Sequence, residues 1–202
     1  MFSSLATFRN NIASIRELAT LHDYLCTNLK SPMTFDDLLR FQIVYSVSAL
    51  DKLIHDLIRI GMVQIFIGTR LATRKYLAET ISMTAYANLS SATIPPKEYY
   101  FEQEIISKLG IVTYQSPDSI AEGLSYIWDE KHKWQKIAAA MDIKENQART
   151  QLKLIVDRRN KITHEADVDI TSGGKFAISK SDCESTVLFI ERCGEEIVKL
   201  VM

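Results

Sequence analysis

The feature that most constrains the fold is residues 34–67, a stretch that is apolar on most of its surface when arranged as a helix. Two neighbouring apolar stripes advance in steps of three and four residues. The first stripe comprises Leu39, Ile43, Val47, Leu50, Ile54 and Leu57, and the second comprises Leu38, Phe41, Tyr45, Ala49 and Leu53. Such a helix needs other elements around it. The sequence therefore predicts a bundle with this helix in the middle.

The remaining segments supply further helices. Only seven glycines and four prolines interrupt the 202 residues, which favours long helices. An amphipathic helix over residues 5–29 ends at Ser31-Pro32, because the residue before proline avoids helical dihedral angles. Further helices are predicted at residues 69–88, 97–109, 143–165 and 181–201, with two short helices between 118 and 140. We expect one all-α domain over residues 1–202, with core helices at 34–67, 143–165 and 181–201 and the others accessory.

Two patterns near the end of the chain predict local structure. Residues 168–170 and 175–178 flank Ser172-Gly173-Gly174, which is typical of a small β-hairpin. Ser181 and Glu184 have the spacing of a capping box, in which each side chain bonds to the backbone of the other residue. The last helix is therefore expected to begin at residue 181, after the hairpin.

Composition excludes several classes of protein. The net charge of −1 argues against a uniformly basic surface that coats nucleic acid. Three cysteines without regular spacing indicate reduced thiols in the cytoplasm. The most apolar run, residues 57–68, contains Arg59 and Gln64 and is too short to cross a membrane. The four histidines are dispersed without zinc-ligand spacing, so no metal or cofactor is predicted.

An arginine interrupts the apolar stripe of the helix predicted at residues 143–165. The stripe runs through Ala148, Leu152 and Ile155, then meets Arg159 where an apolar residue is expected. A guanidinium group stays charged, and burying it without a partner is costly. Arg159 must therefore pair with an acid inside the protein, extend to the edge of the bundle, or face a functional cleft or a partner.

The same helix is locally basic. Residues 144–161 carry six basic side chains against Glu145 and Asp157, a net charge of about +4 on a chain that is slightly acidic overall. The six are Lys144, Arg149, Lys153, Arg158, Arg159 and Lys161. A basic patch suits a polyanion such as RNA, although a solvated helix face has the same composition.

A histidine follows the arginine in this helix. At about 100° per residue, Arg159 and His164 lie about 140° apart around an ideal helix, whereas Asn160 and His164 share a face. One straight helix therefore does not direct Arg159 and His164 at the same atom. An extended arginine side chain, a distorted helix end, or a second copy of the helix in a twofold dimer would bring them together.

The run Arg159-Asn160-Lys161-Ile162-Thr163-His164-Glu165-Ala166-Asp167, together with Ala49-Leu50-Asp51 in the central helix, resembles the HEPN superfamily and is similar to its RiboL-PSP-HEPN branch. The resemblance implies a helical bundle that dimerises so that two motif helices meet in a cleft. Active members are metal-independent endoribonucleases, often toxins or defence effectors. Their products carry 2′,3′-cyclic phosphate and 5′-hydroxyl ends.

The resemblance also implies roles for individual residues. His164 would act as general base or acid, Arg159 would bind the scissile phosphate, and Asn160 would orient the histidine or donate to phosphate. Asp51 would orient Arg159 or His164, with neutralisation of Arg159 as the equal alternative. A second set comprises His55 as a further supporting residue and Arg158, Lys161 and Lys153 as RNA contacts, with solvent the alternative for Arg158.

Two other functions compete with RNA cleavage. The first is a catalytically silent HEPN domain that binds RNA or a protein partner such as an antitoxin or defence protein. The second is a plain structural helical protein in which Arg159 forms an internal ion pair. RNA and a second copy of the chain are the partners expected under the leading hypothesis.

Overall fold

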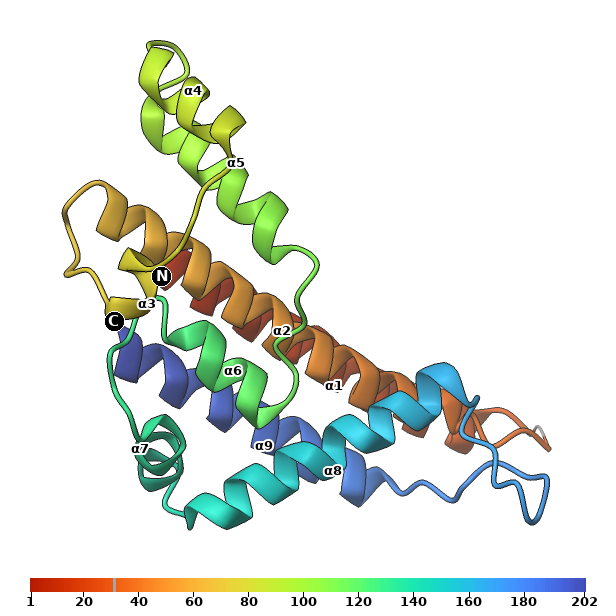
Figure 1. Cartoon of the computed structure of the whole chain (residues 1–202). Helices are drawn as coiled ribbons and strands as arrows, with labels where there is room; N and C mark the ends of the chain where they lie inside the picture. Colours follow the sequence, from red (N-terminus) through yellow and green to blue (C-terminus); the bar gives the residue numbers. More distant parts are fainter. Residues whose placement is uncertain (31) are drawn as a thin grey trace.

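The computed structural model describes residues 1–30 and 32–202, and the described residues form nine α-helices and no strands (Figure 1). The helices are α1 (Phe2–Asn28), α2 (Asp37–Phe66), α3 (Arg74–Leu77), α4 (Met83–Ser91), α5 (Lys97–Leu109), α6 (Pro117–Leu124), α7 (Lys133–Ala140), α8 (Glu145–His164) and α9 (Lys180–Val201). The predicted all-α fold class is confirmed.

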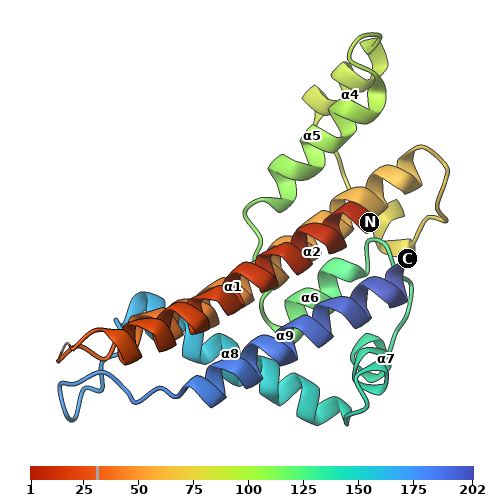
Figure 2. The same cartoon turned by 180° about the vertical axis from the view of Figure 1, so that it is seen from behind.

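Helix α2 is the centre of the bundle, as its apolar stripes predict. It packs against α1, α5, α6, α8 and α9. Its side chains from Leu50 to Ile58 include several that are almost completely buried, among them Leu53, Ile54 and Leu57. Figures 1 and 2 show α1 and α8 on different sides of α2, and α9 packs against both α1 and α2. The two apolar stripes of α2 are therefore covered by different helices.

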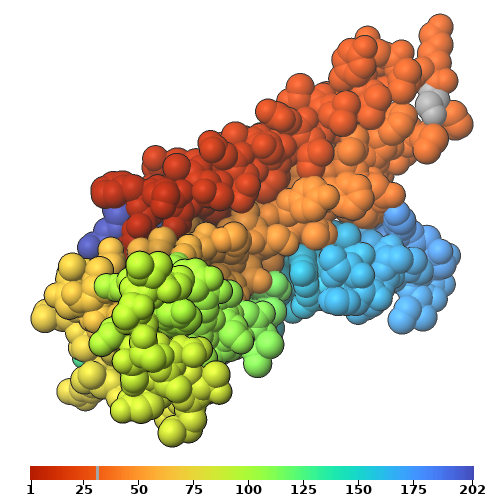
Figure 3. Space-filling model, turned by 90° about the horizontal axis from the view of Figure 1, so that it is seen from above, coloured from red at the N-terminus to blue at the C-terminus, as the bar shows by residue number. Residues whose placement is uncertain are grey.

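Helices α4 and α5 form a hairpin that projects from the bundle (Figures 1 and 2). Helix α4 buries only Ala85, whereas α5 buries Phe101, Ile105 and Leu109. Figure 3 shows the hairpin as a separate lobe at the end of the molecule away from residues 165–179. Helix α5 therefore supplies most of the buried contacts between this hairpin and the main core.

The observed helix boundaries agree with the predicted ones where a residue at the boundary itself ends or caps the helix. Helix α5 occupies the predicted residues and ends at Gly110, and α6 begins after Ser116, whose hydroxyl accepts a bond of 3.0 Å from the backbone N–H of Ser119. The prediction of one helix over residues 69–88 is wrong. Thr73 and Ser82 each cap a new helix instead, so α3 and α4 are separate.

The predicted β-hairpin at residues 168–178 is not formed. A single antiparallel bridge joins Val168 to Lys175 within the described residues. The Asp169 carboxylate accepts bonds of 2.9 Å from the Thr171 N–H and from the Ser172 hydroxyl, which fixes a side-chain-bonded turn. The carbonyl groups of Phe176 and Ala177 accept bonds from arginines rather than from a partner strand.

The predicted capping box at Ser181 is also wrong by two residues. Helix α9 begins after Ser179, whose hydroxyl accepts a bond of 3.1 Å from the Asp182 N–H. Ser179 offers the same hydroxyl cap with the same three-residue spacing, so the chain uses the earlier serine. In the part of the chain that the structure describes, no helix combines the length and apolar character needed to cross a membrane.

Close packing of α1, α2 and α9 depends on Gly194. A Cβ atom at this position would lie 2.6 Å from Cζ of Phe8 and 3.0 Å from Cδ2 of Leu53, both of which are buried. We expect Gly194→Val to lower the free energy of unfolding by about 1–3 kcal/mol through overpacking. Urea unfolding measures the change. The control Ser185→Val adds the same branched side chain at an exposed position of α9, and equal losses in both variants would contradict the close contact.

Candidate active site

The candidate site lies at the C-terminal end of α8, where the helix crosses the start of α2 (Figure 1). Ala148, Leu152 and Ile155 anchor α8 in the bundle. His164 is the last residue of the helix, and it is exposed to solvent. Among the described residues, it has no hydrogen-bond or ion-pair partner. The imidazole is therefore free to meet a substrate or a second chain.

Arg159 is half-buried and has no acidic partner. Its Nη1 donates a hydrogen bond of 3.1 Å to Oδ1 of Asn160, its neighbour in the helix. Its Nε is buried and has no hydrogen-bond partner among the described residues. No carboxylate in that part of the chain lies within ion-pair distance of the guanidinium. Within the described residues, Arg159 therefore lacks the internal ion pair that the sequence left open.

Helix α8 stays regular as far as His164. The Glu165 N–H donates a bond of 3.0 Å to the Lys161 carbonyl, and the Thr163 hydroxyl donates a bond of 3.0 Å to the Arg159 carbonyl. The offset of about 140° between Arg159 and His164 therefore applies to this helix. Asn160 accepts a bond from Arg159 and lies one helical turn before His164, on the same face of α8.

Asp51 and His55 hold a different part of the chain. Oδ1 of Asp51 accepts a bond of 2.7 Å from the Tyr114 N–H, and Oδ2 accepts a bond of 3.0 Å from Nε2 of Gln115. Nε2 of His55 lies 3.0 Å from the Val112 carbonyl oxygen. Both residues anchor the segment that joins α5 to α6. The predicted contact of Asp51 with Arg159 or His164 is not formed within the described chain.

Two of the predicted RNA contacts are exposed cations. Lys153 lies on the solvent side of α8. Lys161 is also exposed, and its Nζ lies 5.0 Å from the centre of the Phe176 ring. Neither forms an ion pair within the described residues. Their contact with RNA stays a prediction, and their positive charges remain unneutralised by the protein.

Arg158 is engaged inside the protein rather than free in solvent. Its Nη2 donates bonds of 2.9 Å to Oδ2 of Asp167 and 3.1 Å to the Ala177 carbonyl. Its Nη1 lies 2.6 Å from Oδ1 of Asp167, an ion-pair contact outside hydrogen-bond geometry. The two adjacent arginines of α8 thus differ: Arg158 has an acidic partner and Arg159 has none.

Arg40 and Asp167 have no predicted role, although Asp167 is the last residue of the motif run. Nε of Arg40 donates a bond of 2.7 Å to Oδ2 of Asp167, whose side chain is fully buried. Nη2 of Arg40 donates a bond of 2.7 Å to the Phe176 carbonyl. Arg40 lies outside both apolar stripes of α2, next to Leu39, so the periodicity that marks Arg159 gives no signal for it. We name Arg40, Arg158 and Asp167 the arginine clamp.

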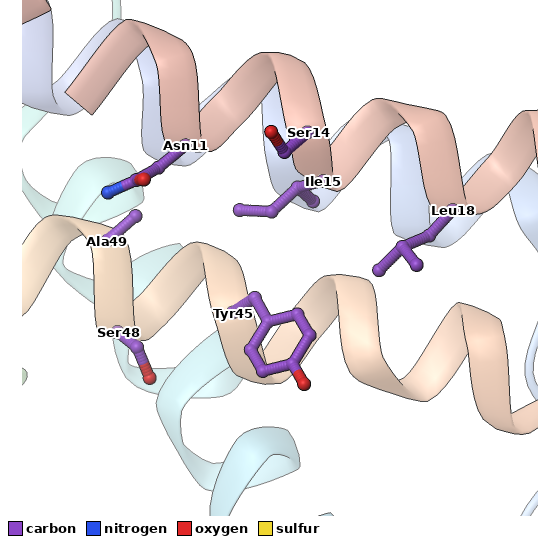
Figure 4. Close-up of a pocket in the computed structure, with 7 residues that line it drawn as sticks. All are labelled: Asn11, Ser14, Ile15, Leu18, Tyr45, Ser48 and Ala49. Carbon is purple, nitrogen blue, oxygen red and sulfur yellow. The ribbon is translucent and has the colours of Figure 1, made fainter. Parts of the chain in front are cut away.

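A groove on another face contains none of the predicted site residues. The groove lies between α1 and α2, encloses about 430 Å³, and is mainly apolar (Figure 4). Its lining residues are Asn11, Ser14, Ile15, Leu18, Tyr45, Ser48 and Ala49. Within the described residues, no three histidine, cysteine, aspartate or glutamate side chains form a cluster that could hold a metal ion.

The contrast between partnered and unpartnered arginines is testable. We expect Arg159→Met to change the free energy of unfolding by less than about 1 kcal/mol, because it removes a buried donor that has no partner. Arg40→Met should cost roughly 3 kcal/mol, because it leaves the buried Asp167 with one cation instead of two. Chemical denaturation of both variants measures the difference. A large loss in Arg159→Met would indicate a hidden internal partner.

A family model provides independent identification. The model of the RiboL-PSP-HEPN family matches residues 9–202, which is nearly the whole chain. Comparisons with curated proteins and with solved structures gave no match. The matched region includes α8 with Arg159 and His164, and α2 with Asp51. The protein therefore belongs to the RiboL-PSP-HEPN family, a branch of the HEPN superfamily.

Proposed function

We propose that this protein is a metal-independent endoribonuclease of the HEPN type that acts as a homodimer. The observation that carries the proposal is the state of Arg159, whose guanidinium is half-buried, bonded to Asn160 and without an acidic partner. A positive charge held in this way supports recognition of an anion from outside the chain. The exposed His164 and the cations Lys153 and Lys161 on the same helix support RNA as that anion.

The chemistry follows from the two side chains. A neutral imidazole of His164 takes the proton of the ribose 2′-hydroxyl, and the 2′-oxygen attacks the adjacent phosphorus. The bond from phosphorus to the 5′-oxygen breaks, and a protonated imidazole supplies a proton to that oxygen. Arg159 stabilises the negative charge that develops on the phosphoryl oxygens. The products carry a 2′,3′-cyclic phosphate and a 5′-hydroxyl group.

A dimer supplies what one chain lacks. The reaction needs a histidine for the proton transfers and an arginine for the phosphate, and both must reach one scissile bond. Because Arg159 and His164 project about 140° apart from one helix, a twofold pair of α8 helices would place the arginine of one chain near the histidine of the other. An RNA-cleaving enzyme of this design suits a toxin or defence effector that is restrained by a partner protein.

Replacement of His164 tests the reaction. We expect His164→Ala to reduce RNA cleavage by at least about 100-fold, because general acid–base catalysis typically contributes that much. Cleavage of a mixed RNA pool in excess chelator, with end-group analysis of the products, measures the effect. His132→Ala is the matched control, since His132 is exposed and lies outside α8. RNA binding without cleavage by the wild type would favour a silent binding domain instead.

A mixing experiment tests the composite site. Arg159→Ala and His164→Ala proteins are each expected to be inactive, but a re-equilibrated equal mixture should recover about a quarter of wild-type activity. Half of the dimers would then be mixed, and each mixed dimer would contain one intact site out of two. No recovery, with exchange of subunits verified by mass spectrometry, would mean that each site uses Arg159 and His164 of one chain.

A further inference from the structure

The position of His164 depends on the backbone that follows it, because its own side chain has no partner among the described residues. Helix α8 ends at His164, and the chain then turns sharply. Ala166 and Asp167 have φ angles of +52° and +61°, in the left-handed region. Two consecutive non-glycine residues rarely adopt this region, since each is strained by contact of Cβ with the backbone. The turn therefore needs external support.

Part of this support comes from the backbone. The Asp167 N–H donates a bond of 3.0 Å to the Lys161 carbonyl, which closes the last turn of α8. The Phe176 N–H donates a bond of 2.8 Å to the Asp167 carbonyl, which brings the returning chain against the turn. Asp167 is therefore the residue through which the end of α8 and the segment before α9 are joined.

The remaining support comes from the arginine clamp. Arg40 of α2 and Arg158 of α8 both bind the Asp167 carboxylate, and each also donates to a carbonyl of the returning chain. A single carboxylate thus connects two helices and the segment after α8. Because Asp167 is fully buried, the carboxylate has little freedom to move, and the turn keeps one conformation.

The clamp is part of a longer series of alternating charges. Lys175 Nζ lies 2.6 Å from Oδ1 of Asp37, and Nη1 of Arg40 lies 3.3 Å from the same oxygen. The bond from Lys175 and the nearby Arg40 hold the pKa of Asp37 below its usual value. Arg40 is therefore held between Asp37 at the surface and Asp167 in the interior.

We infer that Asp167 is a positioning residue for His164: its carboxylate, bound by Arg40 and Arg158, fixes the turn that follows His164 and so sets the direction of the imidazole. The inference rests on the proposed ribonuclease function. Asp167 does not touch the reacting atoms in this role. Its contribution is to hold the last turn of α8 in the conformation that catalysis requires. This turn ends at His164, three residues before Asp167.

Asp167→Asn tests the role, since it keeps the shape of the side chain and removes its charge. We expect kcat to fall about 10- to 100-fold, the effect of a catalytic group displaced by about 1 Å, while KM changes by less than about threefold. The matched control is Asp56→Asn. Asp56 is also a buried carboxylate bound by two cations, Lys52 and Arg59, but it lies elsewhere on α2. Assays are run at a temperature at which circular dichroism shows every variant folded.

A second variant separates positioning from stability. The double variant Arg40→Gln with Asp167→Asn removes one charge of each sign, so it should be more stable than Asp167→Asn alone. We expect its kcat to remain low, because the turn still lacks its carboxylate. If kcat returns to the wild-type value together with stability, or if Asp167→Asn behaves like Asp56→Asn, the positioning role is wrong.

Histidine NMR gives a readout that needs no RNA. The chain has four histidines, and the imidazole signal of His164 is assigned from the His164→Ala spectrum. We expect Asp167→Asn to shift or broaden this signal and to leave those of His22, His55 and His132 unchanged. An unchanged His164 signal would overturn the inference. If the wild type cleaves no RNA, the proposed function fails, and the NMR result alone decides whether Asp167 positions the imidazole.

Discussion

The structure depends on the need to cover α2. A helix of 30 residues with apolar side chains around most of its circumference is stable in water only when neighbours remove that surface from solvent. Helices α1, α8 and α9 cover different sides of α2, and α5 and α6 cover the rest of its apolar surface. The location of the candidate site follows from this arrangement, because α8 reaches the start of α2 while it is still covering the core.

Where α8 meets the start of α2, the contacts between the elements include buried charged side chains as well as apolar ones. Arg40 is buried near the start of α2, and Arg158 and Arg159 lie near the end of α8. Two of these three guanidinium groups are neutralised by Asp167, and the third is not. A buried charge without a counterion costs stability unless a ligand supplies the opposite charge. The protein thus fixes the end of α8 with paired charges and, among the described residues, leaves the guanidinium of Arg159 without a counterion.

The sequence predicted the helices that are determined by residues close together in the chain. Periodic apolar residues indicated α1, α2, α5, α8 and α9. The β-hairpin was wrong because Asp169 and two arginines use the backbone groups that strands would have paired. For the candidate site, the stripe, the spacing and the resemblance predicted Arg159 and His164, whereas they gave no role to Arg40 or Asp167. Their contact joins residues 127 positions apart, and no local pattern reveals such a pair.

The hairpin of α4 and α5 has a consequence for how changes spread through the molecule. It meets the bundle through the buried side of α5, and the segment that follows is pinned to α2 by Asp51 and His55. Asp51 and His55 lie in the middle of α2, about three helical turns or more from Arg40, where the arginine clamp holds the end of α8. The hairpin and the end of α8 therefore meet α2 at separate places, and the tip of the hairpin can vary without touching the contacts around His164.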